Sequence, residues 1–540
     1  MRFFALNGAD EKRRAGQRRK TGIKFPVQRR INFFQKRISF WHGACFIKRQ
    51  QRKNRRTEPI RKIPMYGGTE MKPRYQLLNN DELRKIHETS LKIMREVGIV
   101  FSYEPAREIL KKHGCKVEGH TVFFPSELVE ERLKTVPASF TLHGRNEAKT
   151  VEINTEETCY AGPYGSPYVL DMDNGRRYGT LNDFINLVKL TQSLDNIDIT
   201  SHISCEPNDV DASVRHNVMT FNNLKYSDKP LMGSVLGYDA AKQSIEMAAI
   251  AHGGLDVLKE KTIIASIPCT LTPLSYDDKM AGAIIAYAET NQAQLVNSLS
   301  ISGATTPATF AGTVALQNAE VLAGIVLAQC VNAGCPIVYS ASGSNAEMST
   351  GALAIGSPED AIFSLINGQL AKFYNIPVRI SGTLSDSKMY DTQAAFESAI
   401  TGIMAQLAGG NFILHAAGII ETYNCTSFEK LIVDNELLGY FKHIGHGVEV
   451  NDETLAFDVI KEVGPQGEFL SNMHTFANFR KTFYTPFITN RQNAEQWKAD
   501  GQIPLEKAAN AKWKQMLEDY VEPSLPADVE ADLKKYVESH

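Results

Sequence analysis

The 540-residue sequence contains eight cysteines, and none of them forms a Cys-x-x-Cys pair. This scattered spacing excludes a zinc ribbon and a thioredoxin-type redox motif, and it predicts reduced, mostly buried thiols in a cytoplasmic protein. No run of 18 apolar residues occurs, so we expect no membrane span. Glycine and proline are near their average frequencies, so no long low-complexity linker is expected.

Several signatures of nucleotide and acyl chemistry are also missing. No GxGxxG stands between a strand and a helix, and there is neither a Walker A sequence nor a GxSxG elbow. Clusters of histidines and carboxylates are lacking as well, so we expect no metal site. These absences exclude the common dinucleotide-binding, phosphate-binding and serine-hydrolase classes.

A net positive charge is confined to one end of the chain. Residues 1–64 hold 20 Lys and Arg against 3 Asp and Glu, a net of +17, whereas residues 65–540 have a net of −19. The acidic body argues against nucleic-acid binding. The basic segment has three interpretations: a nucleic-acid-binding arm, a transit peptide, or translated upstream DNA. We favour the third and expect the native protein to start at Met71.

The pattern of apolar residues after Met71 changes near residue 156. Residues 79–136 show helical periodicity, with Asn80 or Asp81 as the expected first cap. From residue 159, short apolar runs alternate with helical patterns. The eight runs are 159–170, 197–207, 230–237, 262–270, 294–303, 336–344, 377–385 and 411–418. Eight β/α units predict an α/β fold of the TIM (β/α)8 barrel type, with a doubly wound open sheet as the alternative.

The tail is helical again, which gives a division into four parts. We expect a basic, disordered extension at 1–70 and a mostly helical N-terminal layer at 71–155. The barrel should occupy 156–425, and a helical C-terminal region packed on the barrel should occupy 426–540.

In a barrel of this kind the active site lies at the carboxyl ends of the strands. Applied to the eight runs, that rule predicts a substrate site built from hydroxyls, amides and aromatics, without a certain catalytic residue. The candidate substrate-binding residues at these ends are Tyr160, Tyr164, His202, Glu206, Thr383, Asp386 and His415. Gly382, beside Thr383, joins them through the resemblance described below.

Each candidate also has a purely structural interpretation. Tyr160 and Tyr164 suit a cage for a quaternary ammonium, because aromatic faces attract cations, but they also suit loop packing. His415 follows the apolar run FIL and is either a substrate contact or a buried core histidine. Asp386, beside Lys388, is either a functional charge or part of a loop salt bridge.

Four long segments resemble the trimethylamine methyltransferase family of corrinoid-dependent methyltransferases. They are SGATTPATFAGTVALQNAEVLAGIVLAQ (302–329), residues 356–418, TSFEKLIVDNELLG (426–439) and residues 455–481. The similarity runs from about Met71 to the C-terminus. It implies a TIM barrel, in agreement with the eight runs, and a methyl transfer from an amine to the cobalt of a separate corrinoid protein.

The resemblance also points to a substrate class. Founding members of the family carry pyrrolysine in the loop that matches Gly382–Ser385, where this sequence has Gly-Thr-Leu-Ser. It is therefore similar to the non-pyrrolysine branch, which implies a quaternary amine, glycine betaine first, with proline betaine, carnitine and γ-butyrobetaine as alternatives. Direct attack by Co(I) would expel a neutral amine and need no general acid.

The same resemblance sets the expected partners. We expect no tightly bound cofactor, a corrinoid protein as partner, and a homo-oligomer in the cytoplasm, with no nucleic acid and no membrane. A protein that binds quaternary amines without turnover is the alternative.

Overall fold

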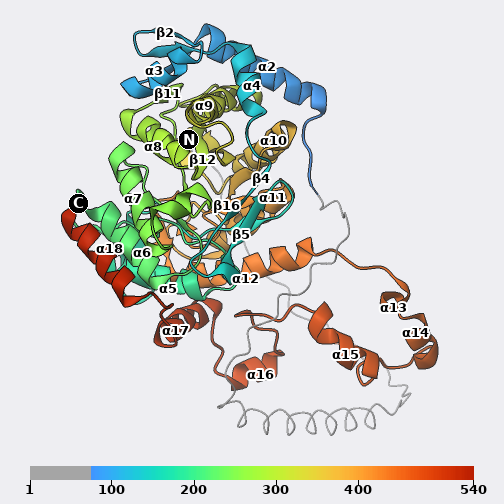
Figure 1. Cartoon of the computed structure of the whole chain (residues 1–540). Coiled ribbons are helices and arrows are strands. Elements are labelled where there is room, and N and C mark those ends of the chain that lie inside the picture. The colour runs from blue at the N-terminus through green and yellow to red at the C-terminus, as the bar shows by residue number, and fades with distance from the viewer. Residues whose placement is uncertain (1–73) are drawn as a thin grey trace, which may run out of the picture. The chain divides into compact units, whose positions relative to one another are not determined.

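A ring of parallel strands forms the centre of the protein (Figure 1). The computed structural model describes residues 74–540, so the predicted extension at 1–70 lies outside the described residues. Neighbouring strands of the ring pair in parallel. In spatial order they are β9 (Leu231–Met232), β10 (Ile264–Ser266), β12 (Ala293–Ser302), β13 (Ile337–Ala346), β15 (Val378–Ser381), β16 (Phe412–Leu414) and β6 (Cys159–Tyr160).

An eighth, very short segment closes the ring. Ala161, after β6, forms a parallel bridge with Ile199, and Thr200 forms one with Leu231 of β9. The segment 199–200 therefore stands where a strand between β6 and β9 belongs. All eight apolar runs supply barrel segments, which confirms the predicted (β/α)8 barrel and excludes the open sheet.

Helices follow the barrel segments and cover the outside of the ring. Side-chain caps start several of them, as at Thr180, Asp277, Asp391 and Ser427. The helices are α5 (Leu181–Ser193), α6 (Arg215–Tyr226), α7 (Tyr238–Ala251), α8 (Asp278–Glu289), α9 (Phe310–Val331), α10 (Pro358–Tyr374), α11 (Thr392–Leu407) and α12 (Phe428–Gly445).

Helix α9 is the most apolar helix of the described chain. By length and composition alone it could cross a membrane, yet 89% of its apolar window is buried inside the protein. The N-terminal layer and the neighbouring helices α8 and α10 pack against it. Its composition is therefore that of a core helix.

A β-hairpin closes the amino-terminal end of the barrel. It consists of β4 (Ser139–Leu142) and β5 (Val151–Asn154), and Leu142 forms a bridge with Thr262, just before β10. Leu142 and Ile153 are completely or almost completely buried and belong to the same apolar cluster as the inward-facing Leu295 and Phe412. The hairpin thus plugs the barrel from below.

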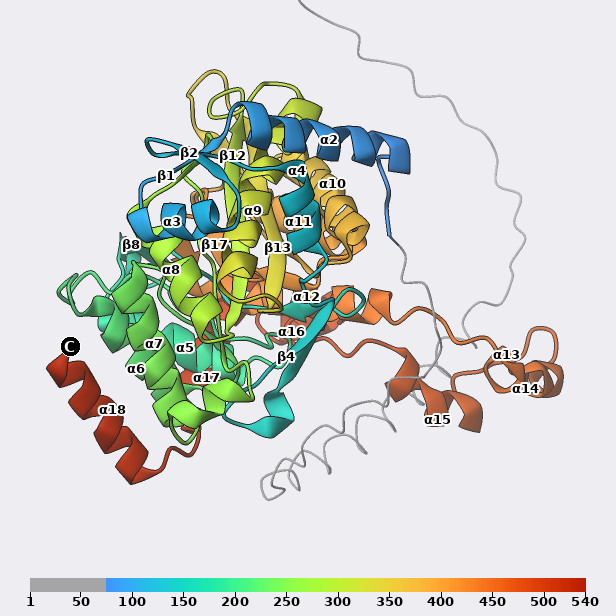
Figure 2. The ribbon, with the colours of Figure 1, turned by 45° about the horizontal axis from the view of Figure 1, so that its top comes forward.

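The N-terminal layer lies over α9 (Figure 2). Its first helix starts one residue earlier than expected, because Asn79 accepts hydrogen bonds from the N–H groups of Asp81 and Glu82 while Glu82 accepts one from Asn79. Its elements are α2 (Asn80–Glu96), β1 (Ile99–Phe101), α3 (Glu104–Lys112), β2 (Lys116–Glu118), β3 (Thr121–Phe123) and α4 (Ser126–Leu133), with β11 (Ser275–Tyr276) pairing with β1.

Small strands gather beyond the carboxyl ends of the barrel strands. They are β7 (Tyr168–Asp171), β8 (Gly175–Tyr178), β17 (Ile419–Ile420) and β18 (Cys425–Ser427), which form one sheet, and β14 (Leu353–Ala354), which pairs with β13.

The C-terminal region leaves α12 and returns to the barrel wall. Helix α17 packs on α12 and α5, and α18 packs on α7 and α6. Helices α13, α14 and α15 lie away from the barrel in both views (Figures 1 and 2). The helices are α13 (Asp452–Leu455), α14 (Phe457–Val463), α15 (Met473–Thr482), α16 (Ala494–Ala499), α17 (Leu505–Glu518) and α18 (Ala527–Ser539).

Candidate functional site

The interior of the barrel changes character halfway along its strands. On β12 and β13, the inward-facing Leu295 and Val338 belong to the apolar cluster at the amino-terminal end of the barrel, the same cluster that contains Leu142 of the hairpin. Two residues further along, Asn297 and Ser340 face the same interior, because side chains on one face of a strand recur every second residue. The hydroxyl of Ser340 donates to Asn297 Oδ1 at 2.8 Å. The barrel therefore carries a polar layer at its carboxyl-terminal end.

Arg379 of β15 is the charged centre of this polar layer. Its side chain is 1% exposed, and its guanidinium donates to the Ser342 hydroxyl and to His415 Nδ1, the latter at 2.8 Å. Its Nε atom has no hydrogen-bond partner within residues 74–540. No carboxylate in that part of the chain forms a salt bridge with it. Burying a cation without a paired anion costs free energy. The site is therefore suited to binding an anionic group of a ligand.

Asp360, in the first turn of α10, is the carboxyl group whose charge acts on Arg379. Burial raises the pKa of the Asp360 carboxyl to about 8, although the positive charge of Arg379 acts in the opposite direction. At neutral pH this carboxyl is mostly protonated. It therefore does not neutralise the guanidinium.

His415 is held in one orientation and one tautomer. Its backbone is left-handed, with φ of 56°. Arg379 donates to Nδ1, so the ring hydrogen lies on Nε2, which donates to the carbonyl oxygen of Tyr164 at 3.0 Å. Burial, followed by the charge of Arg379, lowers the pKa of His415 well below its ordinary value. The imidazole is therefore neutral.

Two tyrosines flank this histidine. The ring of Tyr164 meets it edge-on, with centroids 6.2 Å apart, and the ring of Tyr423 lies 4.8 Å away. The Tyr164 hydroxyl is enclosed and has no hydrogen-bond partner in the described chain. Burial, followed by Cys269 and Glu206, raises the pKa of that hydroxyl. Aromatic surface and an unused hydroxyl thus stand beside the buried cation.

His202 also has unused hydrogen-bonding capacity. It follows the barrel segment 199–200 and is 1% exposed, and neither ring nitrogen has a partner within residues 74–540. Burial, followed by repulsion from His216, lowers the pKa of His202 to about 3. This imidazole is therefore neutral at neutral pH.

The other candidates take different positions. Tyr160 alternates with the inward-facing Cys159 and Ala161, so its ring points outward, where its hydroxyl donates to Gln406 of α11 at 2.8 Å. Glu206 lies at the mouth in an ion pair with Arg215, 2.9 Å apart. The structure thus separates Tyr160 from the polar layer and keeps Glu206 near it.

The loop after β15 is tightly packed. A Cβ on Gly382 would lie 2.6 Å from Ala416 Cα, so only glycine fits there. The Thr383 hydroxyl interacts with the Ala416 carbonyl and with Asp434, and Asp386 accepts hydrogen bonds from the N–H groups of Ile355 and Gly356. Gly382, Thr383 and Asp386 therefore hold this loop in place.

Sequence reasoning missed Arg379, the centre of the layer. The signal was present in PVRISG (377–382), where a charged residue interrupts a run that is otherwise buried. The rule that places active sites at strand ends does not reach Arg379, because this residue lies inside β15.

Exposed apolar side chains surround the mouth above the polar layer. They lie in the carboxyl-terminal half of a barrel strand (Leu299), in loops that follow barrel strands, or at the first residue of a following helix (Phe310). Their exposed fractions are 37% to 80%. We call this set the mouth rim; it consists of Leu236, Leu271, Leu299, Phe310, Met348 and Met389.

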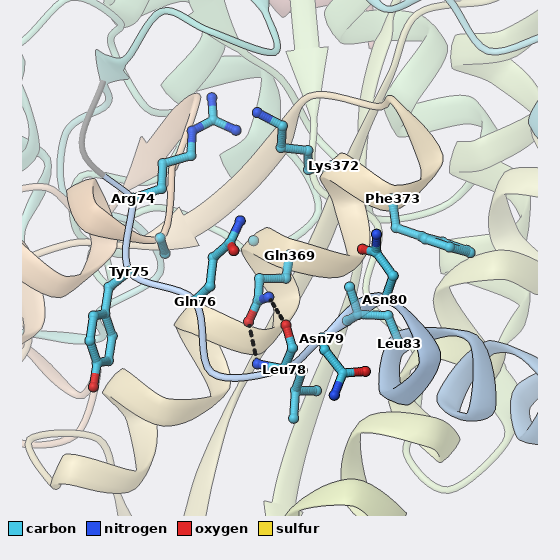
Figure 3. Close-up of a pocket in the computed structure, with 12 residues that line it drawn as sticks. Arg74, Tyr75, Gln76, Leu78, Asn79, Asn80, Leu83, Gln369, Lys372 and Phe373 are labelled. Carbon is cyan, nitrogen blue, oxygen red and sulfur yellow. Dashed lines mark hydrogen bonds between the residues drawn. The ribbon is translucent and has the colours of Figure 1, made fainter. Parts of the chain in front are cut away.

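A separate hollow of about 410 Å³ lies at the end of α10 that precedes β15 (Figure 3). There the Gln369 side chain accepts a hydrogen bond from the N–H of Leu78 and donates one to the carbonyl of Leu78. This hollow belongs to the attachment of the N-terminal segment, at the amino-terminal end of the barrel. It lies apart from the polar layer.

Comparisons with known proteins identify the family of this chain. A family model described as trimethylamine methyltransferase (MTTB) matches residues 47–540. The glycine betaine methyltransferase of Desulfitobacterium hafniense (strain Y51) is 43% identical over 465 residues, 86% of this chain and 97% of the relative. The proline betaine:corrinoid methyltransferase of Eubacterium limosum is 29% identical, over 88% of this chain and 99% of the relative.

Among solved structures, the monomethylamine methyltransferase MtmB of Methanosarcina barkeri is similar with a TM-score of 0.47 and 11% identity, over 84% of this chain and 90% of that one. The family model spans most of the sequence, and the relatives match over nearly their full length. As the sequence resemblance predicted, the chain belongs to the trimethylamine methyltransferase family.

Proposed function

We propose that this protein transfers a methyl group from glycine betaine to the Co(I) centre of a separate corrinoid protein. The observation that carries the proposal is the 43% identity to a glycine betaine methyltransferase over 97% of that relative. The trimethylamine methyltransferase MttB of Desulfitobacterium hafniense (strain DSM 10664 / DCB-2) is 31% identical. The difference favours the betaine.

The charge of the polar layer supports the same substrate. Glycine betaine carries a carboxylate, and trimethylamine does not. Arg379 offers a buried guanidinium with a free Nε–H and no paired carboxylate among residues 74–540. A guanidinium binds a carboxylate through strong, charge-assisted hydrogen bonds. We therefore assign the substrate carboxylate to Arg379.

The aromatic groups beside Arg379 suit the other end of the substrate. Tyr164 and Tyr423 flank the neutral His415. Aromatic faces attract a quaternary ammonium, most strongly where water is excluded. An ionised carboxylate beside the ammonium would stabilise the positively charged substrate and so oppose the reaction. Asp360 does not do this, because its carboxyl group is mostly protonated. Aromatic contacts thus hold the methyl donor without opposing the reaction.

The reaction needs orientation rather than proton transfer. The electron pair of Co(I) attacks the methyl carbon, a Co–C bond forms, and the C–N bond breaks with its pair staying on nitrogen. The products are dimethylglycine and methyl-Co(III). No proton moves, which agrees with neutral histidines at the site. Positioning and exclusion of water supply the rate enhancement.

The corrinoid protein must approach the mouth to deliver its cobalt. The mouth rim offers exposed apolar side chains there, such as Leu271 and Met348. Exposed apolar patches mark protein interaction sites.

All seven cysteines of the described chain are free thiols, as suits a reducing cytoplasm.

Other betaines remain the second candidate. An L-carnitine:corrinoid methyltransferase of Eubacterium limosum is 30% identical over 82% of this chain. Carnitine, proline betaine and γ-butyrobetaine carry the same two charged groups, so Arg379 would serve them equally.

The test is a cobalt spectrum. The full-length chain is mixed with a cognate corrinoid protein held as Co(I), and each amine is added in turn. Glycine betaine should convert Co(I) to methyl-Co(III), and trimethylamine should not. Conversion with another betaine alone would reassign the substrate, and binding of every betaine without conversion would favour the non-catalytic alternative.

A further inference from the structure

A turn of three left-handed residues lies beside the polar layer. Glu421, Thr422 and Tyr423 have φ of 54°, 54° and 67°, and they follow β17 on the way to β18. Ten non-glycine residues of the described chain have positive φ, and no other two of them are adjacent in sequence. The left-handed conformation costs free energy for residues with a Cβ, most of all for a β-branched one such as threonine. The turn is therefore strained, and its surroundings must hold it.

The turn directs the side chain of Tyr423 toward the substrate site. The centroids of the Tyr423 and His415 rings are 4.8 Å apart. The Tyr423 hydroxyl lies 3.1 Å from Ser381 Oγ, at the end of β15. This side chain thus contacts the ends of two neighbouring barrel strands, β15 and β16. A change in the backbone of the turn would move the ring away from both.

Three hydrogen bonds hold the turn on the loop after β15. The Thr422 hydroxyl donates to Asp386 Oδ1 at 2.8 Å. The N–H of Glu421 donates to the carbonyl of Ser387 at 2.9 Å, and the N–H of Thr422 donates to the carbonyl of Ser385 at 3.3 Å. Only the first of these bonds comes from a side chain of the turn, so a substitution can remove it alone.

Asp386 joins this turn to a third segment. Its carboxylate also accepts hydrogen bonds from the N–H groups of Ile355 and Gly356, at 3.0 and 2.9 Å. Its own N–H donates to the Glu397 carboxylate of α11 at 2.9 Å. Lys388 donates to the backbone carbonyl of Asp386, which leaves the carboxylate to these neutral donors. One carboxylate therefore fixes the loops after β14, β15 and β17 relative to one another.

The side chain of Thr422 both strains the turn and secures it. A glycine at this position would adopt the same φ without strain, but it would have no hydroxyl for Asp386. Backbone strain of this kind clusters at active sites, where the function requires the geometry. The geometry that Thr422 and Asp386 maintain is the direction of the Tyr423 ring.

We propose that Asp386 is a positioning residue for methyl transfer. Through the Thr422 hydroxyl it holds the strained turn, and the turn keeps the Tyr423 ring beside His415. This inference rests on the proposed function, in which Tyr164 and Tyr423 bind the quaternary ammonium. Without the bond to Asp386, the turn relaxes and the ring leaves the ammonium. The methyl group is then no longer aligned with Co(I).

Three substitutions of Thr422 test the role of the strained turn. Thr422→Val keeps the shape but lacks the hydroxyl, so kcat/KM for glycine betaine should fall by about 30-fold. Thr422→Ser restores the hydroxyl and should recover most of the loss. Thr422→Gly lacks the hydroxyl but also lacks the strain, so it should lose only about threefold. Steady-state kinetics of cobalt methylation by the full-length chain, with the cognate corrinoid protein, measures all three.

Thr290→Val is the matched control. Thr290 is half-buried, like Thr422, and its hydroxyl donates to the carbonyl of Ala286 at the end of α8. This variant should keep the wild-type kinetics, and circular dichroism establishes that every variant is folded. Wild-type kinetics in Thr422→Val would overturn the inference. So would a loss in Thr422→Ser or Thr422→Gly as large as the loss in Thr422→Val.

A double-mutant cycle shows whether Asp386 acts through Tyr423. Asp386→Ala and Tyr423→Leu should each lower kcat/KM by about 30-fold. The double variant should also lose about 30-fold, because Asp386 has no ring left to position. A loss of about 900-fold, the product of two independent effects, would contradict the inference. Wild-type kinetics in Asp386→Ala would contradict it as well.

The outcomes separate this inference from the proposed function. If the wild type methylates cobalt from another betaine, the same variants are compared with that betaine. If the wild type binds a betaine without turnover, dissociation constants from calorimetry replace kcat/KM and should follow the same order. Turnover by the wild type without these differences among the variants would overturn the inference alone. A wild type that binds no betaine would overturn both.

Discussion

The two halves of the barrel interior differ although the same strands build both. The lower half, at the amino-terminal end of the strands, is filled by Leu295, Val338 and Phe412 and is closed by the β4–β5 hairpin. The upper half holds Arg379 and His415, with polar atoms that have no partner in the described chain. One step of two residues along a strand separates packing from recognition. The comparison teaches that stability and substrate choice can be altered separately.

The largest effect is expected from the charge of the upper half. Arg379→Met should lower kcat/KM for glycine betaine by about 1,000-fold, about 4 kcal/mol, because the substrate carboxylate would lose its charged partner. Arg379→Lys, which keeps the charge, should recover part of the loss. Steady-state kinetics with the corrinoid protein measures both.

The surface variant Arg95→Met is the control, and it should behave like the wild type. Circular dichroism establishes that the Arg379 variants are folded. A folded Arg379→Met with kcat/KM within tenfold of the wild type would remove Arg379 from the site and end the contrast between the halves.

The lower half should respond in the opposite manner. Leu295→Ala should reduce the free energy of unfolding by about 3 kcal/mol, because it leaves a cavity in a close-packed layer. The KM for glycine betaine should stay within about twofold. Denaturant unfolding and kinetics on the same preparation measure the two quantities. A tenfold rise in KM without loss of stability would show that the halves are not separable.

Tyr164 sharpens the comparison within the upper half. Tyr164→Leu should lower kcat/KM by about 30-fold, roughly 2 kcal/mol, because the ammonium would lose an aromatic face. Tyr164→Phe keeps that face and should stay within about threefold. If Phe and Leu are equally damaging, the hydroxyl rather than the ring contacts the substrate.

The smallest expected effect is the dependence of stability on pH that His202 contributes. The pKa of His202 is about 3 in the folded protein and near 6.5 in an unfolded chain. The unfolded state therefore binds a proton that the folded state does not bind, and the contribution of His202 to stability falls as pH drops below about 6.5. The loss should be about 1 kcal/mol between pH 7 and pH 5.5. Asp360, whose pKa of about 8 lies above its unfolded value, contributes in the opposite direction over this range. The measurement is therefore the difference between thermal melts of the wild type and of His202→Gln: the variant should lose about 1 kcal/mol less than the wild type between pH 7 and pH 5.5. His120→Gln should behave like the wild type.

Much of the fold could be predicted from the sequence, because each barrel segment is an apolar run followed by a helical pattern. The segment 199–200 forms only two bridges, yet the apolar residues of its run IDITSHISCEP predicted a barrel segment. The prediction succeeded because a buried segment is apolar even where few strand bridges form. The family could be identified from four long segments.

The site was harder to predict, because the direction in which a side chain points matters more than its position in the sequence. Tyr160 and Tyr164 lie in one run, but alternation turns the Tyr160 ring outward. Of the two, only the Tyr164 ring meets His415, edge-on. Asp386 follows a strand as a functional residue would, yet its carboxylate accepts backbone N–H groups. Arg379 escaped notice because nothing in a single sequence shows which face of β15 it occupies.

The hairpin plug has a kinetic consequence. A barrel sealed below by β4 and β5 has one doorway, so the betaine and the cobalt arrive from the same side. The small molecule must enter first and its demethylated product must leave last. Turnover should therefore follow a compulsory order, and excess corrinoid protein should inhibit by occupying the entrance before the amine has passed.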